Sequence, residues 1–364
     1  MSRERDGDAI VYCQGAFATT NGKTAHGLVR FTRRYRVLSV VDSTTAGHDA
    51  GELLDGRPNG IPVLPTIGTA VEEALGAGRR ATHLVVGVAP DGGRLSPQAR
   101  ADVRQAVELG LNVDSGLHDY LSEDADLSAL AERRTCRLRD IRRPPPREQL
   151  HFFSGKIQEV QAWKVAVLGT DSAVGKRTTA WALVDALHAS GHRAEMVGTG
   201  QTAWLQGARH GIVLDSLVND FIAGEIEHAV WSAWMDGRPE LIVIEGQGSL
   251  MNPAYPGGFE ILAAGRPDAV VVQHAPARKE YDGFPGFPMH PLRRQIDAIQ
   301  IVSDRPVVAV TISHEGLPLD TVPSVCAAIA KETGLPTCDV LLQGAKPVVE
   351  ALLESRRARS HAAC

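Results

Sequence analysis

Residues 164–187 (KVAVLGTDSAVGKRTTAWALVDAL) combine a glycine loop with two adjacent cations. An apolar run enters the loop, and a helical pattern follows it. Glycines let successive backbone N–H groups point at one anion, the helix adds its positive amino-terminal end, and the lysine adds a full charge. The stretch therefore predicts a phosphate-binding loop, and the alternative is an ordinary tight turn between a strand and a helix. The loop residues are Gly169, Thr170, Asp171, Ser172, Ala173, Val174, Gly175 and Lys176.

The residue after the lysine indicates which phosphate the loop suits. The common P-loop has four residues between its glycines and a Ser or Thr after the lysine, whose hydroxyl binds Mg²⁺. Here five residues separate the glycines, and Arg177 follows Lys176. Arginine cannot ligate a cation, whereas its five donors and permanent charge suit a phosphate that lacks a metal. Thr178 and Thr179 carry hydroxyls, but each residue along a helix is a rotation of about 100°. The loop thus predicts phosphate binding with magnesium optional.

A second glycine-rich segment, 241-LIVIEGQGSLMNPAYPG-257, follows an apolar strand pattern. It places Glu245 at the carboxyl end of the strand, where open α/β sheets bind ligands. Glu245 could bind Mg²⁺, act as a general base or bind a substrate amine, and the alternative is a carboxylate that caps a helix. Gly246 and Gly248 allow close backbone approach. Gln247 and the N–H groups around Gly248 are candidate donors to an oxyanion.

Further candidate binding residues lie in loops after strands. In 273-QHAPARKEYDGFPGFPMHP-291, Arg278, Lys279 and Tyr281 suit a carboxylate substrate or an adenine ring, and the alternative is a structured surface crossing. In 198-GTGQTAWL-205 and the segment after it, the candidates that could reach the same ligand are Gln201, Thr202 and Asp220.

The first part of the chain carries weaker signals. Lys23 and His26 lie near one predicted helix start and could bind a carboxylate, or be solvated helix residues. Asp42 follows a strand in the manner of the acidic residue that binds ribose in Rossmann folds. The first turn lacks G-x-G-x-x-G, however, so an NAD site has little support.

Alternating strand and helix patterns must position these loops. Such alternation predicts an α/β protein with two tandem domains, an N-terminal Rossmann-like parallel sheet and a C-terminal P-loop NTPase-like parallel sheet. Between them 133-RRTCRLRDIRRPPPR-147 is basic and proline-rich, which favours an exposed linker over a surface for RNA or an acidic partner. The predicted domains are 1–146 and 147–355, followed by a flexible tail, 356–364.

The composition restricts the class of protein. The 364 residues carry a net charge of −5, and 43% are hydrophobic, which is typical of a globular chain with a proper core. This balance gives no reason to expect nucleic acid or a membrane as a partner. The five cysteines are scattered, none in a CxxC pair, so we expect reduced thiols, no metal site and a cytoplasmic location.

With these motifs assembled, the chain resembles the D-glutamate N-acetyltransferase family, whose members have an N-terminal Rossmann-like domain and a C-terminal P-loop domain. The segments that carry the resemblance in the second half are GTDSAVGKRTTAWAL, GTGQTAWL, IEGQGSLMNPAYPG and HAPARKEYDGFP. In the first half they are GKTAHGLVRF, VVDSTTAGHDAGELLDG and DSGLHDYL. The P-loop half is also similar to dethiobiotin synthetase, whose loop has the same gap but a Thr directly after the lysine.

The resemblance implies transfer of an acetyl group from acetyl-CoA to the amine of an amino dicarboxylate, D-glutamate foremost, in D-amino-acid metabolism. Loop residues 169–179 would then hold the CoA phosphates, and Glu245 would deprotonate the substrate ammonium. Arg278, Lys279 and Lys23 would anchor substrate carboxylates. One departure is Ala203-Trp204, where a second glycine is expected in the family, and this predicts a reshaped pocket.

Two other functions remain open at the level of sequence. One is an ATP- and Mg²⁺-dependent ligase or kinase resembling dethiobiotin synthetase. The other is a nucleotide-sensing binding module without turnover. In each case the expected partner is a small molecule, and a homo-oligomer is expected.

Overall fold

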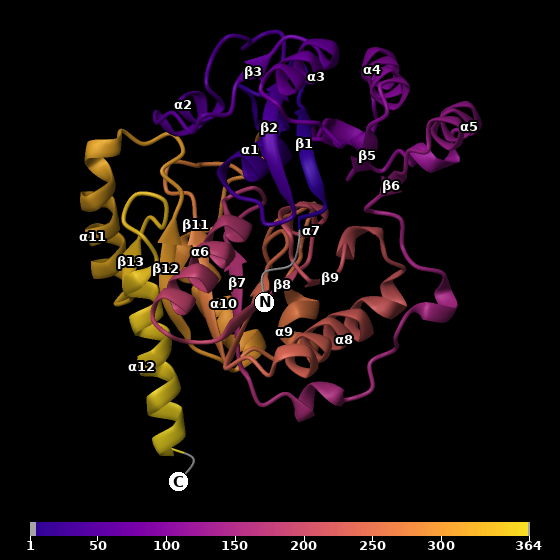
Figure 1. The fold of residues 1–364 in the computed structure, drawn as a ribbon. Coiled ribbons are helices and arrows are strands. Elements are labelled where there is room, and N and C mark those ends of the chain that lie inside the picture. The colour runs from indigo at the N-terminus through magenta and orange to yellow at the C-terminus, as the bar shows by residue number, and fades with distance from the viewer. Residues whose placement is uncertain (1–4, 363–364) are drawn as a thin grey trace. The chain divides into compact units, whose positions relative to one another are not determined.

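The computed structural model describes residues 5–362, which form two compact units (Figure 1). The first unit ends at Pro144 and also includes Gln201–Gly207, and the second contains the rest of the chain. The division lies close to the predicted boundary at residue 146. The sequence predicted an uninterrupted second domain, and the structure corrects this, because Gln201–Gly207 packs with the first unit.

The first unit is built on a six-stranded parallel sheet in the order β3-β2-β1-β4-β5-β6. Its strands are β1 (Gly7–Tyr12), β2 (Tyr35–Val41), β3 (Val63–Leu64), β4 (His83–Val86), β5 (Asn112–Ser115) and β6 (Leu138–Asp140). This is the strand order of a Rossmann fold, and it reverses direction between β1 and β4. The Rossmann-like parallel sheet predicted from the alternating pattern is confirmed.

Six helices belong to the first unit within the described residues: α1 (Lys23–Arg30), α2 (Ala50–Asp55), α3 (Ile67–Gly76), α4 (Pro97–Glu108), α5 (Ala125–Arg134) and α7 (Gln201–Gln206). Local capping explains where α4 begins. Ser96 Oγ accepts the Ala99 N–H at 3.1 Å, and proline occupies the first helical position. Helix α7 follows the glycines of 198-GTGQTAWL-205, and its tertiary contacts are described below.

The second unit has a seven-stranded parallel sheet in the order β13-β12-β11-β7-β10-β8-β9. Its strands are β7 (Trp163–Gly169), β8 (Ala194–Gly198), β9 (His210–Gly211), β10 (Leu241–Glu245), β11 (Ala269–His274), β12 (Val307–Ile312) and β13 (Thr337–Cys338). The strands β7, β10, β11 and β12 are almost wholly buried. This explains why they are continuous apolar runs, since both faces of a parallel sheet are covered.

Helices cover both faces of this sheet. They are α6 (Lys176–Ala189), α8 (Asn219–Gly237), α9 (Phe259–Gly265), α10 (Leu292–Ser303), α11 (Val322–Thr333) and α12 (Lys346–Ala362). One face packs on α8, α9 and α10 through alternate strand residues, among them Ala166 and Leu168. Contacts of α6 and α12 with each other and with the strands form the opposite layer. Within the described residues, no helix has the length and apolar character needed to cross a membrane.

The carboxyl-terminal segment differs from its prediction. A flexible tail was predicted from residue 356, but α12 continues to Ala362. Its buried residues Val348, Val349 and Leu352 pack the helix onto the unit, and Arg359 Nη1 donates to the Asp268 carbonyl at 3.0 Å. This anchoring explains how a short basic sequence remains helical. Residues 363 and 364 lie outside the described residues.

Candidate functional site

The predicted phosphate loop joins the central strand of the second sheet to a helix. Strand β7 ends at Gly169, and α6 begins at Lys176, as predicted. Gly175 has φ of 106° and Ala173 has φ of 53°, both in the left-handed region. This conformation costs a residue with a side chain on the order of 1 kcal/mol, and such strain concentrates at ligand sites. Turns of this kind direct successive N–H groups into one concavity, which is an anion site.

Lys176 lies inside this loop rather than in solvent. Its side chain is 7% exposed, and Nζ donates to the carbonyl oxygens of Asp171 at 2.6 Å and Gly248 at 2.8 Å. An ammonium group has three donors, so one is left for a ligand. Burial lowers the pKa of Lys176 to about 8, against the opposing charges of Asp171 and Glu245. A bound anion would restore the ordinary preference for the charged form.

Asp171 connects the phosphate loop to two other loops. Its carboxylate is fully buried, and Oδ1 accepts from Ser172 N at 2.7 Å and Asn252 Nδ2 at 2.8 Å. Oδ2 accepts from Asp282 N at 2.8 Å and Arg278 Nη1 at 3.0 Å. One carboxylate therefore fixes three segments of chain that are far apart in sequence.

Arg278 donates hydrogen bonds to the phosphate loop from the loop after β11. Nη1 also donates to the Ser172 carbonyl at 2.7 Å, and Nη2 pairs with Glu315 at 2.8 Å. The sequence predicted that Arg278 anchors a substrate carboxylate. In the structure its guanidinium instead contacts protein carboxylates and a loop carbonyl, which makes it a support of the loop.

Glu245 lies at the carboxyl end of β10, as predicted, and only 4% of it is exposed. Oε2 accepts the Thr199 N–H at 2.8 Å, and the Gly200 N–H also faces it. Burial raises the pKa of Glu245, although the Arg177 charge, the Thr199 N–H and Lys176 oppose this effect. The carboxylate thus lies beside both cations of the loop.

The loop after Glu245 approaches other backbone closely. A Cβ at Gly246 would lie 2.4 Å from the Val167 carbonyl oxygen, and one at Gly248 would lie 2.0 Å from that of Tyr255. This confirms the prediction of close backbone approach. Gln247 Nε2 donates to Thr199 Oγ1 at 3.0 Å, which joins the loops after β8 and β10.

Strand β11 contributes polar residues that the sequence analysis missed. Gln273 Oε1 accepts from Thr179 Oγ1 and Thr311 Oγ1, both at 2.5 Å, so Thr179 points into the sheet edge. His274 Nδ1 lies 2.9 Å from Thr170 Oγ1, and burial lowers the pKa of His274 to about 4. Their position at the end of an apolar strand was the available signal. Thr178, which precedes Thr179, is half-buried.

Three further predicted residues of the second unit differ in their exposure to solvent. Tyr281 is 3% exposed, with its hydroxyl 3.4 Å from His290 Nδ1, so its ring offers no open face. Lys279 is exposed. Asp220 is exposed in the first turn of α8.

The other four predicted residues belong to the first unit. Thr202 Oγ1 lies 3.1 Å from Thr24 Oγ1, and Gln201 packs against Gly116, where an added Cβ would lie 2.6 Å from Gln201 Cγ. His26 Nε2 contacts the Phe17 carbonyl at 2.7 Å, while Lys23 is exposed.

Asp42 lies after β2, at the edge of the first sheet where a Rossmann fold binds its dinucleotide, and its carboxylate is bonded within the protein. Asp42 accepts the N–H groups of Gly15 at 3.0 Å and Phe17 at 2.9 Å, and Thr44 also donates to it. Burial acts to raise the pKa of Asp42, but these hydrogen bonds outweigh it and lower the pKa. Asp42 therefore orders the loop after β1 instead of presenting a carboxylate to a ribose.

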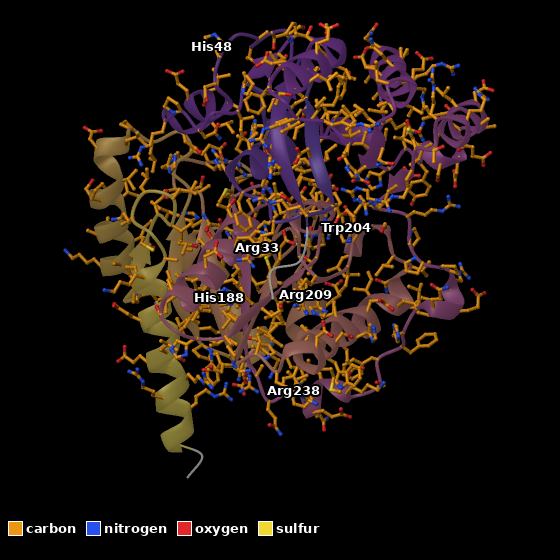
Figure 2. All side chains as sticks on the ribbon, viewed as in Figure 1. Arg33, His48, His188, Trp204, Arg209 and Arg238 are labelled. Carbon is orange, nitrogen blue, oxygen red and sulfur yellow. The ribbon has the colours of Figure 1, made fainter. Side chains whose placement is uncertain are left out.

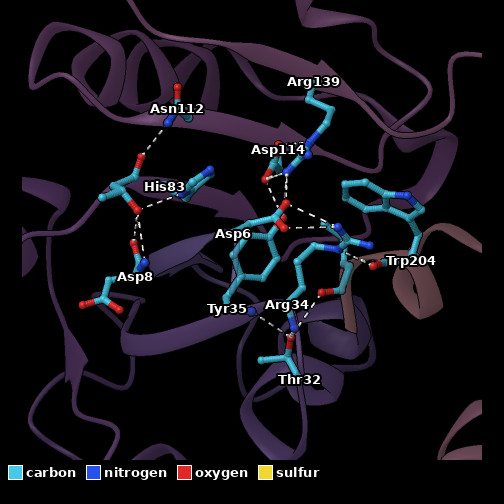
Figure 3. Close-up of polar contacts among 12 residues, drawn as sticks. Asp6, Asp8, Thr32, Arg34, Tyr35, His83, Asn112, Asp114, Arg139 and Trp204 are labelled. Carbon is cyan, nitrogen blue, oxygen red and sulfur yellow. Dashed lines mark hydrogen bonds and ion pairs between the residues drawn. The ribbon is translucent and has the colours of Figure 1, made fainter. Parts of the chain in front are cut away.

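Trp204, labelled in Figure 2, lies on helix α7, which belongs to the first unit. The Arg34 guanidinium lies 3.7 Å and that of Arg139 4.4 Å from the Trp204 ring centroid. Both arginines contact Asp6, and Arg139 pairs with the buried Asp114 at 2.6 Å (Figure 3). The sequence predicted that Ala203-Trp204 reshapes a ligand pocket. The structure instead places Trp204 in this polar cluster.

A Rossmann-ordered sheet and a glycine loop between the central strand of a second parallel sheet and its helix define a two-domain P-loop protein. Residues 151–349 match the family described as "Domain of unknown function (DUF1611_C) P-loop domain", and residues 43–144 match "Domain of unknown function (DUF1611_N) Rossmann-like domain". The chain belongs to the DUF1611 family.

Two curated relatives are similar over most of their length. A protein of Tritonibacter scottomollicae named D-glutamate N-acetyltransferase is 32% identical over 288 residues, 78% of this chain and 84% of that protein. A protein of Pseudoalteromonas sp with the same name is 29% identical over 279 residues, 75% and 81% of the two chains. The crystal structure of a DUF1611 family protein from Anabaena variabilis ATCC 29413 superposes with a TM-score of 0.87 at 27% identity, and covers 95% of this chain and 99% of that one.

Proposed function

We propose that the protein is an N-acetyltransferase that transfers an acetyl group from acetyl-CoA to the amine of an amino dicarboxylate, with D-glutamate as the first candidate. The observation that carries this proposal is the match to two relatives that share the name D-glutamate N-acetyltransferase, over 84% and 81% of their lengths. The chemistry of the phosphate loop supports it independently.

The loop has the donors that the phosphates of coenzyme A require. Ala173 and Gly175 adopt the left-handed conformation that lets neighbouring N–H groups converge on one anion. Lys176 has one donor beyond the two that its carbonyl partners take. Arg177 adds a second cation, whose charge acts on Glu245. A pyrophosphate bearing negative charge suits such a set, because two cations and backbone donors bind it without a metal.

The carboxylate oxygens of Asp171 and Glu245 already accept hydrogen bonds from other groups of the protein. Both oxygens of Asp171 accept two hydrogen bonds each, and Glu245 accepts from the turn at Thr199. A Mg²⁺ ion would need such oxygens as ligands. The donor set therefore favours coenzyme A over an ATP–Mg²⁺ complex, with ligase or kinase activity as the alternative.

The loop after β10 supplies candidates for stabilising the reaction. When an amine attacks a thioester, negative charge develops on the carbonyl oxygen, and positioned N–H groups stabilise it. The N–H groups of Gly246 and Ser249 already bond to the carbonyls of Val167 and Tyr255. We assign the oxyanion to the N–H groups of Gln247 and Gly248, as the sequence suggested.

The experiment measures which ligand the loop binds. Acetyl-CoA should raise the melting temperature more than ATP–Mg²⁺, and D-glutamate with acetyl-CoA should release free thiol. Arg177→Thr should weaken acetyl-CoA binding roughly 10- to 100-fold, since a hydrogen bond to a charged group is worth about 1.5–3 kcal/mol. Arg193→Thr is the matched control, because Arg193 precedes β8 at the opposite end of the strands, with 66% of its side chain exposed.

Other results of these assays would support one of the two alternative functions or exclude Arg177 from the site. ADP release that depends on Mg²⁺, without thiol release, would establish the ligase or kinase. Tight ligand binding with no turnover in either assay would establish the binding module. Unchanged acetyl-CoA affinity in Arg177→Thr would remove Arg177 from the site.

A further inference from the structure

A histidine–carboxylate pair lies at the end of β12, outside the residues assigned above. His314 Nδ1 lies 2.7 Å from Asp339 Oδ2. Asp339 is 1% exposed, and its other oxygen accepts the N–H groups of Leu341 at 2.9 Å and Leu342 at 3.2 Å. The carboxylate accepts hydrogen bonds on both oxygens, so the hydrogen between it and His314 belongs to Nδ1.

This arrangement leaves the other ring nitrogen of His314 as an acceptor. The His314 side chain is 28% exposed, and among the described residues Nε2 has no hydrogen-bond partner. A buried carboxylate that fixes the tautomer of a partly exposed imidazole is the arrangement that orients a general base.

Two chains of contacts connect this pair to the phosphate loop. Ser313 N donates to the His274 carbonyl at 2.8 Å, and His274 Nδ1 contacts Thr170 of the loop. On the other side, Glu315 pairs with Arg278, which donates to the Ser172 carbonyl. The pairings His274↔Ile312 and Gln273↔Gly169 place the ends of β12, β11 and β7 at the same sheet edge. His314 is thus at the ligand-binding edge of its sheet.

The other titratable groups at this edge are less suited to take a proton from a substrate. Glu245 is 4% exposed and accepts N–H groups from the turn at Thr199. His274 is half-buried with Nδ1 against Thr170, and burial lowers the pKa of His274 to about 4, so it is a weak base. His314 is the imidazole at this edge that is paired with a buried carboxylate.

We propose that His314, oriented by Asp339, is the general base that deprotonates the substrate ammonium in acetyl transfer. This inference rests on the proposed function and deepens it. The sequence suggested Glu245 as the base. In this assignment Glu245 instead positions the turn at Thr199 and Gly200. Asp339 is a positioning residue.

The proton balance of the step is simple. Nε2 takes one proton from the ammonium, and the free amine forms the C–N bond with the thioester carbonyl carbon. The C–S bond breaks as the nitrogen loses its second proton, and the thiolate leaves. The imidazolium returns its proton to that thiolate, so that each turnover yields an amide, a free thiol and one proton released to solvent.

The groups that face the pair determine how its charge responds to pH. Asp339 is the carboxylate bonded to the imidazole, and Glu315 is neutralised by Arg278. The thiols of Cys326 on α11 and Cys338 on β13 also face Asp339, and its negative charge acts to raise the pKa of each thiol. Burial raises the pKa of both thiols, to about 12 for Cys338, so they stay neutral in an ordinary assay.

The test is the pH dependence of His314→Gln with D-glutamate and acetyl-CoA. We expect kcat to fall about 10²- to 10³-fold, with unchanged acetyl-CoA affinity, because general base catalysis contributes about 10²–10⁴-fold. The deficit should shrink as the pH approaches the pKa of the substrate amine, since the amine then needs no base. Imidazole in solution should partly restore His314→Ala, and Asp339→Asn should lower kcat with the same pH dependence.

The chain supplies a matched control. His192 Nδ1 contacts Glu240 Oε2 at 3.1 Å, and both residues precede strands, β8 and β10, at the opposite edge of the same sheet. His192→Gln should leave kcat unchanged. A His314→Gln enzyme with wild-type kcat would overturn the assignment, as would a deficit that stays constant with pH and resists imidazole. Absence of acetyl transfer in the wild type would instead refute the proposed function, and the assignment of His314 with it.

Discussion

The carboxylate of Asp171 should be the most costly single polar group to alter in the second unit. Asp171→Asn keeps the shape of the side chain but replaces one acceptor oxygen by an NH₂ group. Two donors face Oδ1, from Ser172 and Asn252, and two face Oδ2, from Arg278 and Asp282. Either orientation of the amide therefore sets an NH₂ group against two donors.

The neighbours cannot rearrange to remove this conflict. The Asn252 amide cannot flip, because its Oδ1 accepts the N–H groups of Ala254 at 2.9 Å and Tyr255 at 2.8 Å. Each buried donor left without an acceptor costs about 1–3 kcal/mol, so we expect a loss of about 4 kcal/mol in the free energy of unfolding. For a unit of this size that corresponds to roughly 8–16 °C in melting temperature.

Calorimetry with and without acetyl-CoA measures the effect of the substitution on the melting temperature and on acetyl-CoA binding. Asp171→Asn should lower the melting temperature of the second unit and weaken acetyl-CoA binding, because the three loops that form the site lose their common anchor. The matched control is Asp42→Asn in the first unit, which is equally buried. One donor, Phe17 N, faces its Oδ2, so its cost should be about half, with acetyl-CoA binding unchanged. Equal binding by wild type and Asp171→Asn would refute the reasoning.

Two further predictions concern one residue in each unit. Acetyl-CoA affinity should fall as the pH rises through about 8, because burial lowers the pKa of Lys176 to about 8 and the neutral amine no longer attracts phosphate. Lys176→Arg, which stays charged, should show a flat profile by titration calorimetry, and identical profiles would contradict this origin. Trp204→Ala should destabilise the first unit by about 2–4 kcal/mol in thermal unfolding, since it removes the ring that Arg34 and Arg139 both contact. Trp204→Phe should recover much of the loss, and an equal loss in both variants would show that ring contacts are not the cause.

The elements with local signals were predicted well from sequence. Helix α6 begins at Lys176 because Gly175 adopts a left-handed conformation directly before it, and α4 begins after the cap Ser96. The buried strands of the second sheet appeared as apolar runs. These features depend on residues that are close together in the chain, so they can be predicted from the sequence.

Side-chain contacts between loops that are distant in the sequence could not be predicted in the same way. A charged side chain in a loop after a strand can contact a ligand or another loop, and its type does not distinguish the two. Arg278 illustrates this ambiguity, since it was predicted to bind substrate and instead supports the phosphate loop through Ser172. Trp204 illustrates it again, because its ring packs against Arg34, which lies 170 residues away in the chain.

The sequence by itself determined the phosphate loop: its glycines, its two cations and the helix that follows. Tertiary structure alone decided which polar side chains remain available to a ligand. His314 and Asp339 are 25 residues apart, and the parallel pairing of β12 with β13 brings them within hydrogen-bond distance. The physical reason is that backbone conformation is set largely by local interactions, whereas the partner of a side chain depends on which strands the fold places side by side.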